Sequence, residues 1–79
     1  MAVGRYEYQS DFARKYIAEG RAEGEAAGRA ESLFAVCAAR GFTLTEAQRT
    51  RVRECTDSAA LDRWIRRAVG VEDPAAIFE

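Results

Sequence analysis

The sequence contains no histidine, and this absence limits the acid–base catalysis that the chain can carry out. Histidine is the side chain whose ordinary pKa lies closest to neutral pH, so the commonest general base is absent. The two cysteines, Cys37 and Cys55, form no CxxC pair, and two thiols cannot supply the four ligands of a structural zinc site. We therefore expect no metal and no cofactor, and we predict that both cysteines are small buried apolar side chains.

Long apolar runs and a charge excess are also missing. No stretch approaches the ~18 apolar residues of a membrane span, and the first residues lack the apolar segment of a signal peptide. The 12 basic residues balance 13 acidic ones, whereas nucleic-acid binders usually carry a basic surplus. With 79 residues, the chain is expected to form one small cytoplasmic domain with no membrane contact, whose core alone is marginal.

Candidate catalytic groups are few. Carboxylate pairs such as Glu19 and Glu23 fall on a predicted solvated helix surface, without the burial that a catalytic acid–base pair requires. Ser32 has no base partner in the sequence, and Cys55 close to Arg53 is better explained as a packed thiol at a helix end. The sequence predicts that this chain is not an enzyme.

Three glycines are spaced four residues apart, at Gly20, Gly24 and Gly28. Residues four apart are neighbours on a helix surface, so the three form one smooth ridge. Each glycine costs about 1 kcal/mol relative to alanine inside a helix, which is roughly 3 kcal/mol for the ridge. We expect a partner backbone to pack closely on this ridge; the alternative is a passively helical spacer.

A long helix is predicted from about residue 10 to residue 40. Ser10 is a plausible N-cap, no proline interrupts the segment, and Gly41 is suited to the left-handed position after a helix. Such a helix is about 45 Å long and needs a covering surface. The sequence therefore predicts a homodimer or higher oligomer, whose interface comprises Phe12, Tyr16, Ile17, Gly20, Gly24 and Gly28.

Two short helices and a final turn are predicted after Gly41. Thr45 and Gln48 form a capping box for the first, which runs to about Glu54, and Thr56 or Asp57 starts the second. Gly70 is expected to end that second helix, and a helical turn follows Pro74. The predicted fold class is all-α. Residues 1–32 form an N-terminal helical arm that carries the glycine ridge, and residues 33–79 form a small helical head. The predicted head core comprises Leu33, Phe34, Val52, Leu61, Trp64, Ile65 and Ala68.

A different function class, nucleic-acid contact, also has a candidate site. Residues 49–67 can form a helix–turn–helix that places Arg63, Arg66 and Arg67 on its second helix. Residues 40–79 nevertheless contain seven arginines and seven acidic residues, so this segment is neutral. We treat a DNA-contacting accessory domain as the alternative to oligomerisation.

Several segments of the chain resemble one bacterial family. They are YQSDFARKY at 8–16, EGRAEGEAAGRAE at 19–31, the segment 33–41 that ends in RG, CTD at 55–57 and LDRWIRRA at 61–68. Together they resemble the helical C-terminal tail of Rpn-type recombination-promoting nucleases, or putative transposases, whose catalytic PD-(D/E)xK domain lies N-terminal to it. The chain has no Glu-x-Lys, since its one lysine is Lys15, so no catalytic residue carries over. The resemblance implies that such a tail associates with the full-length nuclease and, as a free fragment, acts as an antitoxin-like inhibitor.

Overall fold

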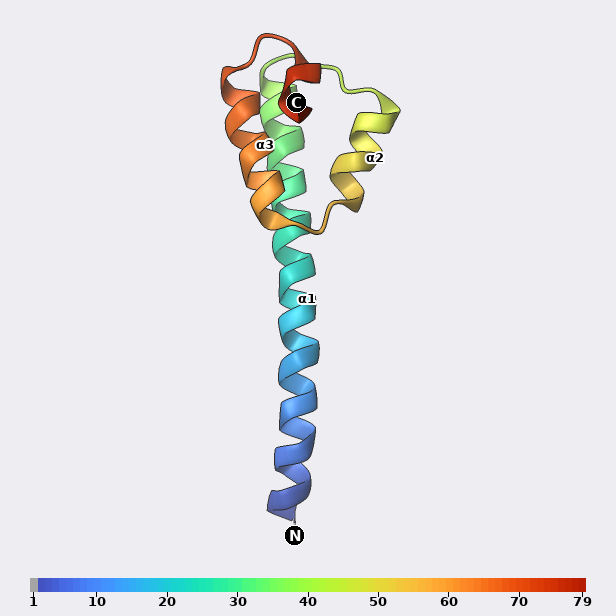
Figure 1. The fold of residues 1–79 in the computed structure, drawn as a ribbon, viewed down its shortest axis with the longest axis vertical. Helices are drawn as coiled ribbons and strands as arrows, with labels where there is room; N and C mark the ends of the chain where they lie inside the picture. Colours follow the sequence, from blue (N-terminus) through green and yellow to red (C-terminus); the bar gives the residue numbers. More distant parts are fainter. Residues whose placement is uncertain (1) are drawn as a thin grey trace.

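The computed structural model describes the backbone of residues 2–79 and the side chains of residues 14–79 apart from Tyr16. It contains three α-helices, α1 (Ala2–Ala39), α2 (Glu46–Glu54) and α3 (Ser58–Gly70), and a 3-10 turn, η1 (Pro74–Phe78) (Figure 1). No strand occurs in residues 2–79, so the predicted all-α class is confirmed. The side chains of Phe12 and Tyr16, both named in the predicted interface, lie outside the described residues.

Helix α1 is longer than its sequence signals indicated. It begins at Ala2, so the prediction that Ser10 caps its N-terminus is wrong. A capping residue favours a helix start but does not enforce one, and no proline lies upstream to stop the helix. Its 38 residues correspond to about 57 Å, and the whole molecule measures 62 × 21 × 20 Å. The fold is thus a small head on a long helical arm.

Gly41 ends α1 as expected. Its φ is 74°, its N–H donates to the Ala38 carbonyl at 3.0 Å, and the Phe42 N–H donates to the Cys37 carbonyl at 2.8 Å. These two bonds are those of a Schellman motif, in which a left-handed residue turns the chain back over the last helical carbonyls. The turn directs the chain from α1 towards α2.

Replacing Gly41 with alanine should lower the free energy of unfolding by about 1–2 kcal/mol. The cost arises because a side chain disfavours the left-handed backbone that this position adopts. Gly70→Ala is the matched control: Gly70 is helical, and a Cβ there meets nothing within 4 Å, so its effect should be neutral or stabilising. Urea denaturation followed by circular dichroism measures both variants. Equal effects would contradict the assigned role of Gly41.

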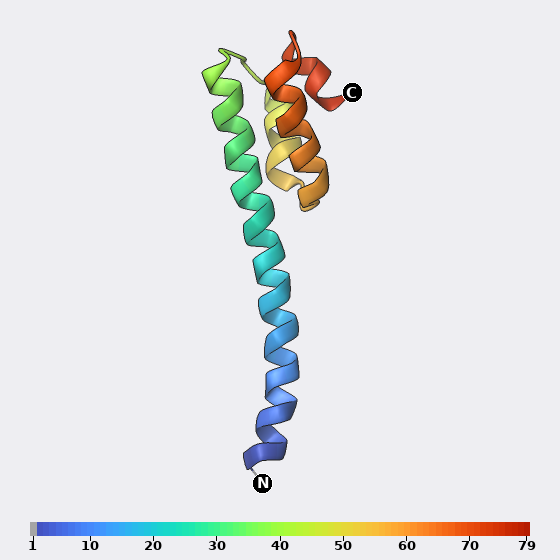
Figure 2. The same cartoon turned by 90° about the vertical axis from the view of Figure 1, so that its left-hand side faces the viewer.

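Side-chain caps begin the two short helices. The Thr45 hydroxyl accepts from the Gln48 N–H at 3.1 Å, and the Gln48 side chain accepts from the Thr45 N–H at 2.9 Å. Asp57 caps α3 by accepting from the N–H of Ala59 at 3.0 Å. Gly70 is the last residue of α3 and not the residue after it, because its backbone stays helical and Val71 makes the closing bond to Arg67. Figure 2 shows α2 and α3 on the same side of α1.

The core lies where the last part of α1 meets α3. Five of the predicted core residues, Leu33, Val52, Leu61, Trp64 and Ala68, are buried, and the remaining two, Phe34 and Ile65, are half-buried against them. The predicted core omits further buried residues, which are Ala26, Ala30, Leu44, Ala60 and Ile77, whereas the predicted burial of Cys37 is confirmed. Because Ala26 and Ala30 belong to this core, head packing starts seven residues before the predicted boundary at residue 33.

Candidate oligomerisation interface

The part of α1 that precedes the head is uncovered by its own chain. Every described side chain from Arg14 to Glu25 is exposed, and the first buried residue of α1 is Ala26. Among the described side chains of this stretch, Ile17 is the large apolar one, and 56% of it is exposed. An arm of this length gains no tertiary stabilisation from the residues that the structure describes (Figure 1).

The glycine ridge faces away from the head. Gly20, Gly24 and Gly28 are all exposed, and a Cβ built on any of them would meet no atom within 4 Å. Gly28 lies two residues from both Ala26 and Ala30, which places it about 200° around the helix from them. Packing within the described chain therefore gives no reason for glycine at these positions.

Ion pairs connect the head end of α1 to its surroundings. Arg29 lies 4.0 Å from Glu25 on the same helix and 3.9 Å from Asp62 of α3. Arg21 and Glu31, by contrast, form no salt bridge with any residue whose side chain is described. Helix α1 thus presents both an exposed small-residue face and charges that form no ion pair with a described side chain.

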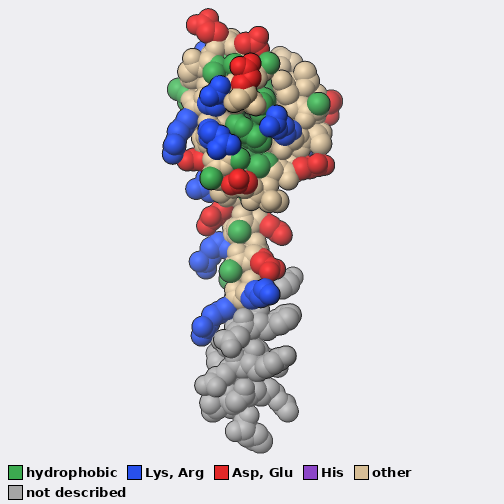
Figure 3. Space-filling view, in the orientation of Figure 1, with side chains coloured by type: hydrophobic (Ala, Val, Ile, Leu, Met, Phe, Trp, Pro, Cys, Tyr) green, Lys and Arg blue, Asp and Glu red, His purple; other side chains and the backbone are tan. Residues whose placement is uncertain are grey.

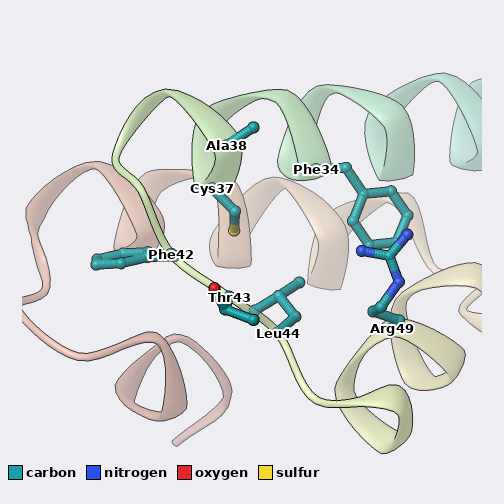
Figure 4. A pocket seen from close by; sticks show the side chains of 7 residues that line it. All are labelled: Phe34, Cys37, Ala38, Phe42, Thr43, Leu44 and Arg49. Carbon is teal, nitrogen blue, oxygen red and sulfur yellow. The ribbon is translucent and has the colours of Figure 1, made fainter.

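A pocket of about 270 Å³ lies between the end of α1, the loop that follows and α2 (Figure 4). Figure 4 shows Phe34 and Arg49 at one end, Phe42 at the other and the Cys37 thiol between them. The Arg49 guanidinium carbon lies 5.1 Å from the centre of the Phe34 ring. The residues that line the pocket are Phe34, Cys37, Ala38, Phe42, Thr43, Leu44 and Arg49.

The lining of this pocket is suited to apolar contact and not to covalent chemistry. Burial raises the pKa of the Cys37 thiol, so the thiol stays protonated and is a poor nucleophile. Cys55, which was also predicted to be buried, is half-buried. Sequence reasoning missed the pocket, although the aromatic residues Phe34 and Phe42 on either side of the helix end were a usable signal.

The three arginines proposed for nucleic-acid contact are in different environments. Arg66 donates to the Asp62 carboxylate at 2.8 Å, and Arg67 donates from Nε and Nη2 to the Ala76 carbonyl at 3.1 and 3.0 Å. Arg63 is exposed and makes no ion pair with a described side chain. Figure 3 shows basic and acidic side chains interspersed over one face of the head. The predicted trio is therefore not a set of free cations.

Other head arginines act as structural groups. Arg40 donates from Nη1 to the carbonyls of Ala68 and Val71, where α3 ends. The Arg51 guanidinium lies 5.2 Å from the Trp64 ring centre and 5.5 Å from that of Phe78. Through these contacts, part of the positive charge of the head holds its elements together.

Among the described side chains, no group of three acidic or cysteine residues is placed to hold a metal ion. Over the same residues, no helix combines the length and the apolar character needed to cross a membrane. The exposed face of α1 is thus the strongest candidate for a functional surface in the described part of the chain.

Comparison with protein-family models, with curated proteins and with solved structures gives no significant match. Nothing in these comparisons identifies the Rpn-type family that the segments at 8–16 and 19–31 resemble.

Proposed function

We propose that this chain is a non-catalytic homo-oligomerisation module, in which the α1 helices of two or more copies pair along the glycine ridge. The observation that carries the proposal is the open space at Gly20, Gly24 and Gly28, where no described atom lies within 4 Å of a built Cβ. Three helical glycines cost roughly 3 kcal/mol, and within the described chain they permit no close contact in return. A second helix on the ridge would gain the close backbone approach that glycine allows.

The size of the head supports the same proposal. A domain of this length buries a smaller fraction of its surface than a larger one and is correspondingly marginal. The described arm leaves Ile17 exposed and adds no core. Pairing of arms would bury apolar surface and stabilise the helix, because most helical stability in proteins comes from packing.

We extend the proposal to a biological partner on the basis of the resemblance at residues 8–16 and 19–31. A full-length nuclease that carries the same tail would be assembled through it. A free copy of the tail would compete for that pairing surface and hold nuclease subunits in mixed, inactive assemblies. The support for this role is the resemblance, and titrating the chain into a DNA-cleavage assay of a tail-bearing nuclease tests it.

Gly24→Leu should weaken self-association at least 100-fold and leave α1 as helical as before or more so. A leucine at the centre of the ridge holds a second backbone away, while it is a better helix former than glycine. The measurement is the mass from light scattering over a wide range of protein concentration, since the native chain should give at least twice 8.8 kDa. Circular dichroism reports the helix content.

Gly70→Leu is the matched control for this variant. Gly70 is also helical and exposed, with no described atom within 4 Å of a built Cβ, but it belongs to α3. Its substitution should leave the dissociation constant within about threefold of the native value. A Gly24→Leu chain that dimerises with native affinity would remove the ridge from the interface.

A further inference from the structure

We infer that α1 pairs with α1 of a second copy in the antiparallel direction, with the two helices crossing level with Ala26. The inference rests on the proposed function and specifies the alignment of the partner. Helix α1 carries a stripe of exposed residues that recur at alternating spacings of four and three, as in a coiled-coil seam. The stripe consists of Ile17, Arg21, Gly24, Gly28, Glu31 and Ala35, and all six are exposed.

This stripe lies on the side of α1 that the head leaves bare. Ala26, Ala30 and Leu33 define the opposite side, because they are buried in the head core. Figure 2 shows both short helices on one side of α1 and nothing of the chain along the other. A second helix can therefore lie along the stripe past the head end of α1.

The charges on the stripe select the antiparallel direction. Arg21 and Glu31 have no salt-bridge partner among the described side chains, and they are ten residues apart, about 15 Å along one helix. In a parallel pair in register, Arg21 would face Arg21 and Glu31 would face Glu31. In the antiparallel pair, residues equally distant from Ala26 face each other, so Arg21 of each copy meets Glu31 of the other.

The same alignment accounts for the other members of the stripe. Gly24 of one copy lies opposite Gly28 of the second, so glycine occurs on both sides where the two backbones must be closest. Ile17 lies opposite Ala35, at the level of the half-buried Phe34 ring. In this alignment, Ile17 buries apolar surface against the head end of the second copy.

Charge reversal on the full chain tests this alignment. Arg21→Glu and Glu31→Arg should each raise the dimer dissociation constant roughly fivefold to twentyfold at low salt, since each creates two like-charge contacts per dimer. The double variant Arg21→Glu/Glu31→Arg should return to within about threefold of the native constant. Sedimentation equilibrium over a concentration series measures all four proteins.

Recovery of affinity in the double variant would indicate contact between chains, because Arg21 and Glu31 are too far apart on one helix to interact within a chain. Lys15→Glu is the control: it changes net charge as Arg21→Glu does, but Lys15 lies outside the stripe, so its effect should stay under about threefold. A native chain that stays monomeric at high micromolar concentration would overturn the proposed function and this inference together. A native dimer whose double variant shows no recovery would overturn the antiparallel alignment and leave the oligomerisation module standing.

Discussion

Trp64→Ala should lower the free energy of unfolding by about 4 kcal/mol, in the range measured for large aromatic truncations in protein cores. Trp64 is only 7% exposed, and its ring makes an edge-to-face contact with Phe78 at 5.1 Å between centres. A chain of this length is expected to be stable by roughly 4–12 kcal/mol, so the variant should be near the limit of folding.

The effect is large because the Trp64 side chain, on α3, packs against α1, α2 and η1. Trp64 belongs to α3 and packs in the core beside α1, its edge-to-face contact fixes η1, and its ring face lies 5.2 Å from the Arg51 guanidinium of α2. Removing the indole therefore leaves a cavity and also removes a contact to each of η1 and α2, which contribute one buried residue each to the core, Ile77 and Val52.

Urea denaturation followed by circular dichroism at 222 nm gives the loss, since Trp64 is the one tryptophan and its fluorescence is absent from this variant. Trp64→Phe keeps an aromatic ring for Phe78 and should lose less than half as much. Val69→Ala is the control on the same helix, because Val69 is 63% exposed and should change stability by under about 0.5 kcal/mol. A loss of less than 1 kcal/mol for Trp64→Ala would show that the head does not depend on this contact.

Ile77→Ala should cost about 3 kcal/mol, although the residue lies in a turn of five residues. The Ile77 side chain is fully buried and belongs to the same core cluster as Leu33 and Leu61. The turn is held in place from outside, by the two bonds that Arg67 donates to the Ala76 carbonyl. Ile77 therefore closes the core as part of an anchored element.

Ala75 provides the comparison for this prediction. It lies in the same turn but is exposed, so Ala75→Ser should change the unfolding free energy by under about 0.5 kcal/mol. Chemical denaturation of both variants, with Trp64 fluorescence as the signal, separates burial from turn propensity. If both substitutions cost the same small amount, η1 frays and the core closes without Ile77.

Local signals predicted the boundaries of the short elements well. The Thr45–Gln48 capping box, the Asp57 cap and the left-handed Gly41 each depend on bonds between residues at most five apart. The identity of such residues is enough to recognise them, because the partners are neighbours in the sequence. The α3 stripe was recognisable for a similar reason, since its apolar residues recur with helical spacing.

The packed face of α1 could not be predicted in this way. The sequence has sixteen alanines, and Ala26 and Ala30 are buried while Ala27 and Ala35 on the same helix are exposed. Because alanine occupies both faces of α1, hydrophobic periodicity does not show which face is buried. The buried and exposed alanines are distinguished only by the contact of α1 with α3. The glycine ridge was recognisable from its spacing, but its orientation away from the head follows from that same long-range contact.

Ile77 was left out of the predicted core for a related reason. A turn of five residues is too short to show a period, and its position depends on Arg67 and Trp64 in the preceding helix. The early start of α1 was missed because the preference of Ser10 for a cap position is weaker than helix continuation through it.

The length of α1 also determines how this protein behaves in transport measurements. Its radius of gyration is 17.6 Å, whereas a compact chain of the same length would have about 12 Å. A radius of 17.6 Å is that expected for a compact chain of roughly 240 residues, about three times the actual length. A single copy should therefore diffuse more slowly and elute earlier than a globular chain of the same mass. The elution volume and the diffusion coefficient depend on the length of the arm. Only an absolute mass therefore gives the number of copies in an assembly.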